Sequence, residues 1–295
     1  MGFKRATKKQ ARLRMALIGP SGSGKTYSAL NIGQHLGERI ALVDTERGSA
    51  SKYADLFQFD VLELENFHPQ RYIDAIHEAE AAGYDVLILD SLSHAWMGKD
   101  GALELVDKAA KRSGSGNTFG AWREVTPIHN ALVDAILQSS CHVIATMRAK
   151  TDYAQERDEK TGKTIIRKLG LAPVQRDGLE YEFDIVADMT LDNELVVSKS
   201  RCPALTGAVV SKPGQEVADV VRQWLTEGEP APVRIPSAFA RYQTAIAGAA
   251  SIQDLQDIGQ QIAADSTISA FERNSLRTDY RERQDALERA SETLL

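Results

Sequence analysis

Residues 19–26, with the sequence GPSGSGKT, constrain this chain more than any other segment. They directly follow an apolar run at residues 13–18 and precede a stretch of helix-forming residues at 25–36. In such a loop, glycines let backbone N–H groups face the phosphates of a nucleotide, a lysine reaches the β- and γ-phosphates, and a threonine hydroxyl binds Mg²⁺. The segment therefore predicts a strand, a phosphate-binding loop and a helix in direct succession.

The expected ligands of this loop are ATP and Mg²⁺. Lys25 is the predicted phosphate-binding cation, and Thr26 is the predicted ligand of the metal within the loop. The full set of predicted nucleotide contacts is Gly19, Pro20, Ser21, Gly22, Ser23, Gly24, Lys25, Thr26 and Tyr27. The alternative is a glycine-rich turn with a chance lysine, which the flanking strand and helix patterns disfavour.

Composition narrows the class of protein further. The chain has 295 residues, enough for one large domain and a small one, and its net charge of −6 argues against a globally basic nucleic-acid coat protein. No apolar run approaches the roughly 20 residues of a membrane-spanning helix, and the basic N-terminus lacks the apolar stretch of a secretory signal. Two cysteines without metal-like spacing fit a reducing compartment. We therefore expect a cytoplasmic protein with no membrane partner.

Strand-like and helix-like segments alternate along most of the chain, which predicts an α/β fold with a mostly parallel sheet covered by helices on both faces. The expected strands are residues 13–18, 39–44, 59–64, 84–90, 141–147, 183–190 and 194–199. The expected helices are residues 25–36, 69–82, 101–112 and 119–139. Residues 151–168 predict two polar strands around an exposed hairpin or loop.

Changes in composition divide the chain into four parts. Residues 1–12 form a basic tail, residues 13–228 the α/β core, residues 229–236 a Pro-rich linker and residues 237–295 a small helical domain. Helical periodicity in the last part predicts three short helices in a small bundle. The tail could contact phosphates, pack on a neighbouring subunit, or be solvated.

Two acidic segments supply the carboxylates that an ATPase site needs. Asp90 ends the apolar strand at 84–90, where a carboxylate can support Mg²⁺. Ser91 follows it instead of a glutamate, so the group that orients the attacking water must come from elsewhere. Glu46 is the best candidate, because we expect the strand at 39–44 to neighbour the loop strand and to end at the same edge of the sheet. Asp44, two residues earlier, could also reach the γ-phosphate or be structural, and the alternative for Glu46 is a solvated acidic turn.

The phosphate loop, Glu46 and the Asp90–Ser91 pair together resemble the RecA-like ATPase core, in which a similarly placed glutamate activates water. The resemblance spans residues 13–212 and implies a RecA-like P-loop NTPase fold with ATP hydrolysis. Together with residues 143–153 (VIATMRAKTDY) and 199–201 (KSR), these segments look like a phage-type AAA/RecA-core family. Some members of that family are single-strand-annealing recombination proteins. This second resemblance implies a role in DNA recombination, annealing or repair, in the cytoplasm of a bacterial host.

Lys199 and Arg201 resemble a K-x-R pair that, in ring- and filament-forming relatives, reaches the nucleotide of a neighbouring subunit. A cation inserted in this way stabilises charge on the transferring phosphoryl group. The resemblance therefore implies a homo-oligomer, ring or filament, with ATP at its subunit interfaces; an exposed polar strand end is the alternative. Arg148, at a position where RecA relatives commonly carry glutamine, is a candidate sensor of the γ-phosphate, with Thr146 as the runner-up.

Single-stranded DNA is the partner that the resemblance implies, and two segments are candidates for binding it. The candidate contacts are Lys111, Arg112 and Asn117 in the first segment and Lys150, Lys163, Arg167 and Lys168 in the second. Cations in such loops follow phosphates, and aromatic side chains can stack on bases. Acidic residues dilute the second cluster, so a solvated hairpin of mixed charge fits it equally well. A single-stranded-DNA-binding protein is a further candidate partner.

Three functions are compatible with these features. The first is an oligomeric ATPase that binds single-stranded DNA in recombination, annealing or repair. The second is a replicative helicase or a helicase loader, which would separate strands with a direction. The third is a nucleotide-dependent scaffold or switch that binds a partner through residues 237–295, which Glu46 disfavours because a switch needs no efficient hydrolysis.

Overall fold

The computed structural model describes residues 5–112, 118–157, 164–229, 238–268 and 270–292. Internal contacts divide the chain into two compact units, Met1–Ala231 and Pro232–Leu295. Of the linker expected at residues 229–236, only residue 229 belongs to the described part of the chain. Within the described residues, no helix is both long enough and apolar enough to cross a bilayer.

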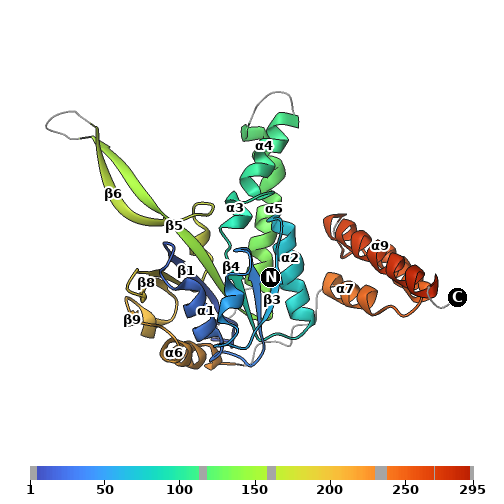
Figure 1. Ribbon diagram of the computed structural model, residues 1–295, viewed down its shortest axis with the longest axis horizontal. Helices are drawn as coiled ribbons and strands as arrows, with labels where there is room; N and C mark the ends of the chain where they lie inside the picture. The colour runs from blue at the N-terminus through green and yellow to red at the C-terminus, as the bar shows by residue number, and fades with distance from the viewer. Residues whose placement is uncertain (1–4, 113–117, 158–163, 230–237, 269, 293–295) are drawn as a thin grey trace. The chain divides into compact units, whose positions relative to one another are not determined.

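The first unit is built on a mixed sheet whose central strands are parallel (Figure 1). The strand order is β3-β2-β4-β5-β1-β7-β8-β9, and β6 pairs with β5 outside this path. The strands are β1 (Arg14–Gly19), β2 (Ile40–Asp44), β3 (Asp60–Glu63), β4 (Val86–Asp90), β5 (His142–Arg157), β6 (Thr164–Pro173), β7 (Ile185–Met189), β8 (Glu194–Ser200) and β9 (Val209–Ser211). The expected α/β fold with a mostly parallel sheet is confirmed.

Helices cover both faces of this sheet. One face is covered by α1 (Lys25–Gly33) and α6 (Gln215–Thr226), and the other by α2 (Pro69–Ala81) and α5 (Thr118–Gln138). The short helix α3 (His94–Met97) and then α4 (Ala102–Arg112) follow β4. Among the described residues, short 3₁₀ helices occupy Ala50–Tyr53, Leu179–Tyr181 and Pro203–Leu205. Both α6 and β9 are absent from the elements expected from sequence.

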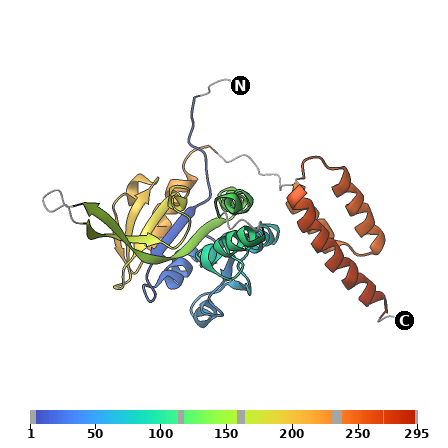
Figure 2. The same ribbon diagram turned by 90° about the horizontal axis from the view of Figure 1, so that it is seen from above.

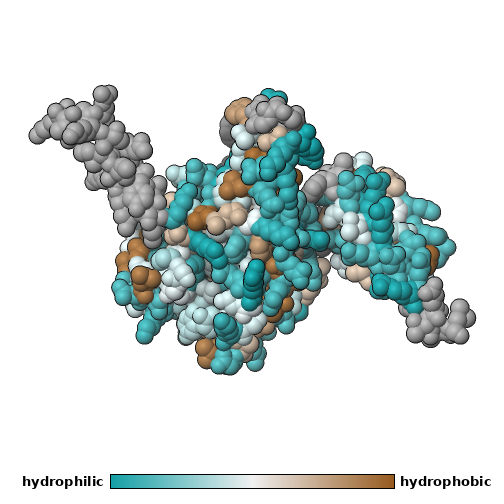
Figure 3. Space-filling view, turned by 45° about the horizontal axis from the view of Figure 1, so that its top comes forward, coloured by the Kyte–Doolittle hydropathy of each residue, from teal (hydrophilic) through white to brown (hydrophobic). Residues whose placement is uncertain are grey.

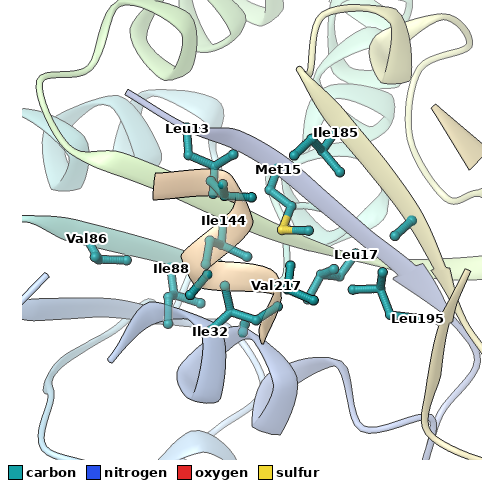
Figure 4. Close-up of a cluster of buried hydrophobic side chains, with 14 of the residues drawn as sticks. Leu13, Met15, Leu17, Ile32, Val86, Ile88, Ile144, Ile185, Leu195 and Val217 are labelled. Atoms are coloured by element: carbon teal, nitrogen blue, oxygen red, sulfur yellow. The ribbon is translucent and has the colours of Figure 1, made fainter. Parts of the chain in front are cut away.

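Successive residues of β1 contribute to two separate cores, because side chains alternate between the two faces of a strand. Met15 and Leu17 pack with α1 and α6, whereas Ala16 and Ile18 pack with α2 and α5. Figure 4 shows the first of these cores, to which Ile32 of α1 and Val217 of α6 contribute together with Met15 and Leu17 of β1. Burial on both faces explains why the central strands are almost continuously apolar in sequence.

The strand β5 belongs to two sheets in succession. Up to Arg148 it pairs in parallel with β1, and from Ala149 onward it pairs with the antiparallel strand β6. Figure 1 shows the β5–β6 pair extending beyond the sheet as a two-stranded ribbon. The predicted hairpin is confirmed, although its first strand is the direct continuation of the predicted strand at 141–147, and its turn at 158–163 lies outside the described residues.

The described part of the N-terminal tail packs against the end of α6 in its own chain. The backbone N–H of Gln10 donates to the carbonyl of Glu229 at 2.8 Å, and the N–H of Glu229 donates to the carbonyl of Lys8 at 2.9 Å. The ammonium of Lys8 also pairs with Glu227 at 2.5 Å. This segment is therefore held against the C-terminal end of α6 of its own chain, an arrangement that we did not expect from sequence.

The described part of the second unit consists of α7 (Ala238–Gly248), α8 (Ile252–Ala264) and α9 (Ala270–Glu292), drawn in orange to red in Figure 2. The expected three helices are present, but α9 has 23 residues and is not short. Phe239, Ile246, Leu255 and Leu276 form a core of their own. Hydrophilic residues cover most of both units in the face that Figure 3 presents, and hydrophobic residues form small separate patches there.

Candidate active site

The phosphate loop joins β1 to α1, and two of its positions require glycine. A Cβ atom on Gly19 would lie 2.6 Å from Oγ of Ser23 and 2.7 Å from the carbonyl oxygen of Met189, so no side chain fits there. Gly24 has a φ of 80°, in the left-handed region that glycine adopts at little cost. These constraints hold the loop close to the end of β7 and turn its backbone toward the start of α1.

Lys25 lies inside the curve of this loop. Its ammonium donates to the carbonyl oxygens of Gly19 at 2.9 Å and Pro20 at 2.8 Å. Burial lowers the pKa of Lys25, and the nearby carboxylates of Asp90 and Glu46 oppose that shift. A partly buried cation held by neutral carbonyl groups can exchange them for a phosphate oxygen, which is a stronger partner because it is charged.

Asp90, at the end of β4, is the centre of a small hydrogen-bond network. Its Oδ2 accepts a bond of 2.6 Å from the hydroxyl of Thr26 on α1, and its Oδ1 accepts one of 2.5 Å from the hydroxyl of Thr146 on β5. Burial raises the pKa of Asp90, and the two hydroxyl groups oppose that shift. The runner-up for the sensor, Thr146, thus contacts the carboxylate directly.

The pairing of Thr26 with Asp90 fits a bound Mg²⁺. Mg²⁺ takes oxygen ligands and is commonly held by one or two protein groups together with waters and substrate phosphates. Within the described ranges, no group of three or more His, Cys, Asp or Glu side chains could hold a metal ion. Thr26 and Asp90 would hold Mg²⁺ together with waters and the phosphates of a nucleotide.

Glu46 reaches the site from a strand that is not where we expected it. The prediction that the strand at 39–44 neighbours the loop strand is wrong, because β4 and β5 lie between β2 and β1. All four strands are parallel, so their carboxyl ends still lie along one edge of the sheet. Asp44, only 1% exposed, accepts bonds from the backbone N–H groups of Glu46 and Ala50 and so shapes the turn.

The side chain of Glu46 pairs with that of Arg148. Nε and Nη2 of Arg148 donate to Oε1 of Glu46 at 3.0 and 2.9 Å. The side chain of Glu46 is 31% exposed and that of Arg148 is 42% exposed, so the pair lies at the surface of the site. The structure therefore brings the predicted water-orienting carboxylate and the predicted sensor into direct contact.

Sequence reasoning missed the polar side chains that connect these groups. The hydroxyl of Thr45 lies 2.6 Å from Nδ1 of His94 and accepts a bond of 2.8 Å from the backbone N–H of Ser91. The hydroxyl of Ser93 accepts a bond of 2.9 Å from the backbone N–H of Arg148. The sequence signal for these residues was their position near Glu46 and Asp90. That signal is not specific, because several hydroxyl groups follow a strand end and the sequence does not distinguish between them.

A comparison with known families agrees with this geometry. A family model described as an AAA domain matches residues 11–228. The chain belongs to this AAA domain family. Nucleotide binding by a P-loop NTPase domain follows from the family and from the loop that carries it. A search of curated proteins finds no match to the chain.

In this AAA domain, Lys199 and Arg201 lie at the edge of the sheet opposite the phosphate loop. Ile185 of β7 pairs both with Met15 of β1 and with Ser200 of the antiparallel strand β8. The loop begins at the other end of β1, about 13 Å away at the usual rise of a strand. Neither cation can therefore serve the phosphate loop of its own chain.

The two cations differ in how their own chain engages them. The ammonium of Lys199 donates to the backbone oxygens of residues 180, 181 and 183 at 3.2, 2.5 and 2.7 Å. Arg201 forms an ion pair with Asp184 at 3.1 Å and is 55% exposed. Arg201 is consequently the more accessible of the two for a contact outside the chain.

The candidate DNA contacts lie on two projections of the AAA domain. Lys111 and Arg112 end α4, and Arg112 pairs with Glu124 of α5 at 2.5 Å. Lys150 is exposed at the start of the ribbon, and Arg167 and Lys168 belong to β6. Asn117 and Lys163 fall outside the described residues. Figure 1 shows α4 and the ribbon leaving the same side of the sheet.

Proposed function

We propose that this AAA domain is a Mg²⁺-dependent ATPase that forms oligomers and acts on single-stranded DNA in recombination, annealing or repair. The observation that carries the enzymatic part is the convergence of Lys25, Thr26, Asp90 and Glu46 on one edge of the sheet. These residues come from α1, β4 and the turn after β2, and hydrogen bonds connect Thr26 to Asp90. A structural role alone gives no reason for a cation, a hydroxyl and two carboxylates to meet beside a glycine loop.

Each residue has a distinct task in this proposal. The loop N–H groups and Lys25 bind the β- and γ-phosphates, while Thr26 and Asp90 hold the metal, which neutralises developing charge on the phosphate oxygens. Glu46 orients the attacking water. Arg148 releases Glu46 and binds the γ-phosphate, since a phosphate is a better partner for a guanidinium than a partly exposed carboxylate.

A neighbouring copy of the chain completes the site in our proposal. Arg201 lies on the edge opposite the loop and is more than half exposed, so it can approach the phosphate loop of a second copy. An arginine supplied in this way raises phosphoryl-transfer rates by about 10³–10⁵ in GTPases. The isolated chain should therefore hydrolyse ATP slowly.

Single-stranded DNA is proposed as the partner because basic residues occur on two projections at the phosphate-loop side of the sheet. Arg148 ends the part of β5 that pairs with β1, and the ribbon begins at the next residue. A residue that senses the γ-phosphate would thus adjoin the ribbon that carries Lys150. This arrangement offers a direct route by which nucleotide binding could alter DNA binding.

The test is the ATPase rate with and without single-stranded DNA, combined with DNA binding over a series of salt concentrations. We expect DNA to stimulate hydrolysis and the affinity to fall with salt, because phosphate contacts release counterions. Lys25→Ala is the control that should abolish turnover. Hydrolysis without any DNA binding at low salt would leave an ATPase and remove the DNA role. Strand-annealing and strand-separation assays then distinguish an annealing protein from a helicase.

A further inference from the structure

The turn between β7 and β8, residues 190–193, forms one wall of the phosphate loop. The N–H of Asn193 donates to the carbonyl of Thr190 at 3.1 Å, and the N–H of Thr190 donates to the carbonyl of Glu194 at 3.0 Å. The carbonyl of Asn193 accepts a further bond of 2.9 Å from the N–H of Lys212. The φ of Asn193 is 60°, which lies in the left-handed region that asparagine tolerates better than most residues. The backbone of this turn is therefore held from both sides.

The side chain of Asn193 rests against the last glycine of the loop. A Cβ atom on Gly24 would lie 3.3 Å from Nδ2 of Asn193 and 3.5 Å from its Cγ. Gly24 directly precedes Lys25, so the amide is at the rim of the phosphate-binding surface. Among the described residues, no hydrogen bond involves this amide, although it has both a donor and an acceptor. The amide is therefore held next to the loop, but none of the described residues hydrogen-bonds to it.

A nucleotide bound to this loop must extend its nucleoside past the rim. Bound phosphates would occupy the loop and the start of α1, and the base would then lie beyond the rim of the loop. One wall is aromatic: Tyr27 contacts Tyr53 and Phe57, with ring centroids 5.8 and 5.2 Å apart. Aromatic rings stack on any base and do not distinguish adenine from guanine. The wall with Asn193 differs, because the hydrogen-bonding groups of an amide can distinguish adenine from guanine.

We propose that Asn193 reads the adenine edge and makes this site selective for ATP over GTP, an inference that rests on the nucleotide binding proposed above. An asparagine amide matches adenine because its oxygen accepts from the exocyclic amino group while its NH₂ group donates to a ring nitrogen. Guanine presents a carbonyl at the corresponding position, which faces the amide oxygen with a second acceptor. Leu191, in the same turn, is an exposed apolar side chain (69%).

The test compares three nucleotides on the wild type and on three variants. Purine riboside triphosphate lacks only the exocyclic amino group of ATP. GTP has a carbonyl at that position and carries an additional amino group at C2. Asn193→Gly removes the amide and tolerates the left-handed backbone, while Asn193→Asp keeps the shape and loses the donor. Asp192→Ala, in the same turn, is the matched control. Binding is measured with the intact protein by competition against a fluorescent nucleotide, alongside kcat and KM.

For the wild type, we expect ATP to be preferred over both other nucleotides by about 5- to 150-fold, the range that a good paired contact with a base supplies. Asn193→Gly should weaken ATP by a similar factor through KM, change kcat little, and bind all three nucleotides alike. Asp192→Ala should keep the preference. An undiminished preference for ATP in Asn193→Gly would overturn the assignment while leaving the ATPase intact. Failure of the wild type to bind any nucleotide would overturn both.

Discussion

Glu46 and Arg148, 102 residues apart in the chain, are joined by two hydrogen bonds of 2.9 and 3.0 Å at the edge of the sheet that carries the phosphate loop. Because both side chains are partly exposed, water screens the pair and it contributes little to stability. The pair can therefore exchange partners when an anion competes for the guanidinium. In the proposed ATPase, binding of a γ-phosphate by Arg148 leaves Glu46 free to orient water.

Glu46→Gln is expected to retain nucleotide binding and to lose at least about tenfold in kcat, because the amide keeps the size of the side chain but no longer acts as a carboxylate toward water. Single-turnover hydrolysis and the dissociation constant of a fluorescent nucleotide are the measurements. Glu63→Gln, at the end of β3 and opposite Asp44, is the matched control. Normal turnover in Glu46→Gln would place the water-orienting group elsewhere.

Arg148→Gln is expected to reduce the difference in affinity between ADP and a non-hydrolysable ATP analogue. In this proposal the guanidinium of Arg148 contacts only the γ-phosphate, which ADP lacks. ADP binding should therefore change little, whereas binding of the ATP analogue should weaken. The ratio of the two dissociation constants is the readout, because a general loss of structure would weaken both. Arg222→Gln on α6, where Arg222 pairs with Asp219 at 3.1 Å, is the control. An unchanged ratio would exclude Arg148 as a sensor.

Mixing Arg201→Ala subunits with Lys25→Ala subunits is expected to restore part of the ATPase activity that each variant lacks alone. An interface between the two kinds of subunit can combine an intact phosphate loop with an intact Arg201, because these features lie on opposite edges of the sheet. Activity is measured across mixing ratios after mixed oligomers have been verified by native mass spectrometry. No recovery in such oligomers would argue against a role for Arg201 in trans.

Stability of the AAA domain is expected to fall between about pH 6.5 and pH 4 because of His142. Burial lowers the pKa of His142 to about 4, and the neighbouring Arg12 and Arg14 add to this shift. The unfolded chain, with a histidine pKa of about 6.5, binds the proton first as the pH falls, so the free energy of unfolding decreases by up to about 3 kcal/mol. Above about pH 6.5, neutral His142 makes its full contribution to the free energy of unfolding.

The measurement is urea unfolding followed by tryptophan fluorescence at pH 7 and pH 4.5. The three tryptophans, at positions 96, 122 and 224, all belong to the first unit, so the signal reports this unit alone. His142→Gln cannot titrate in this range and should show a smaller loss of stability over the same interval. Equal losses in the two proteins would show that His142 does not control the pH dependence.

The phosphate-binding chemistry was predictable because consecutive residues carry it. Eight residues between an apolar strand and a helix specify the loop, and Asp90 is recognisable because it ends a strand that is buried along its whole length. Periodicity also predicted most of the strands and helices, since burial of one or two faces leaves a repeating pattern in the residues themselves.

The order of the strands was not predictable in this way, and the error in placing β2 beside β1 shows why. Parallel central strands have similar apolar sequences, so nothing local distinguishes the neighbours of one from those of another. Long crossover connections then decide which strand ends meet. The contact of Glu46 with Arg148 depends on that order, because it joins the ends of β2 and β5 across β4.

The GPSGSGKT motif thus identified a nucleotide site from the chain alone, whereas tertiary structure decided which distant residues share it. Packing brought Thr146 and Arg148 to the loop, set Asn193 against Gly24, and placed Lys199 and Arg201 on the far edge. The physical reason is that a loop's backbone conformation is encoded by its own glycines, while the meeting of strand ends depends on how the whole sheet buries its two faces.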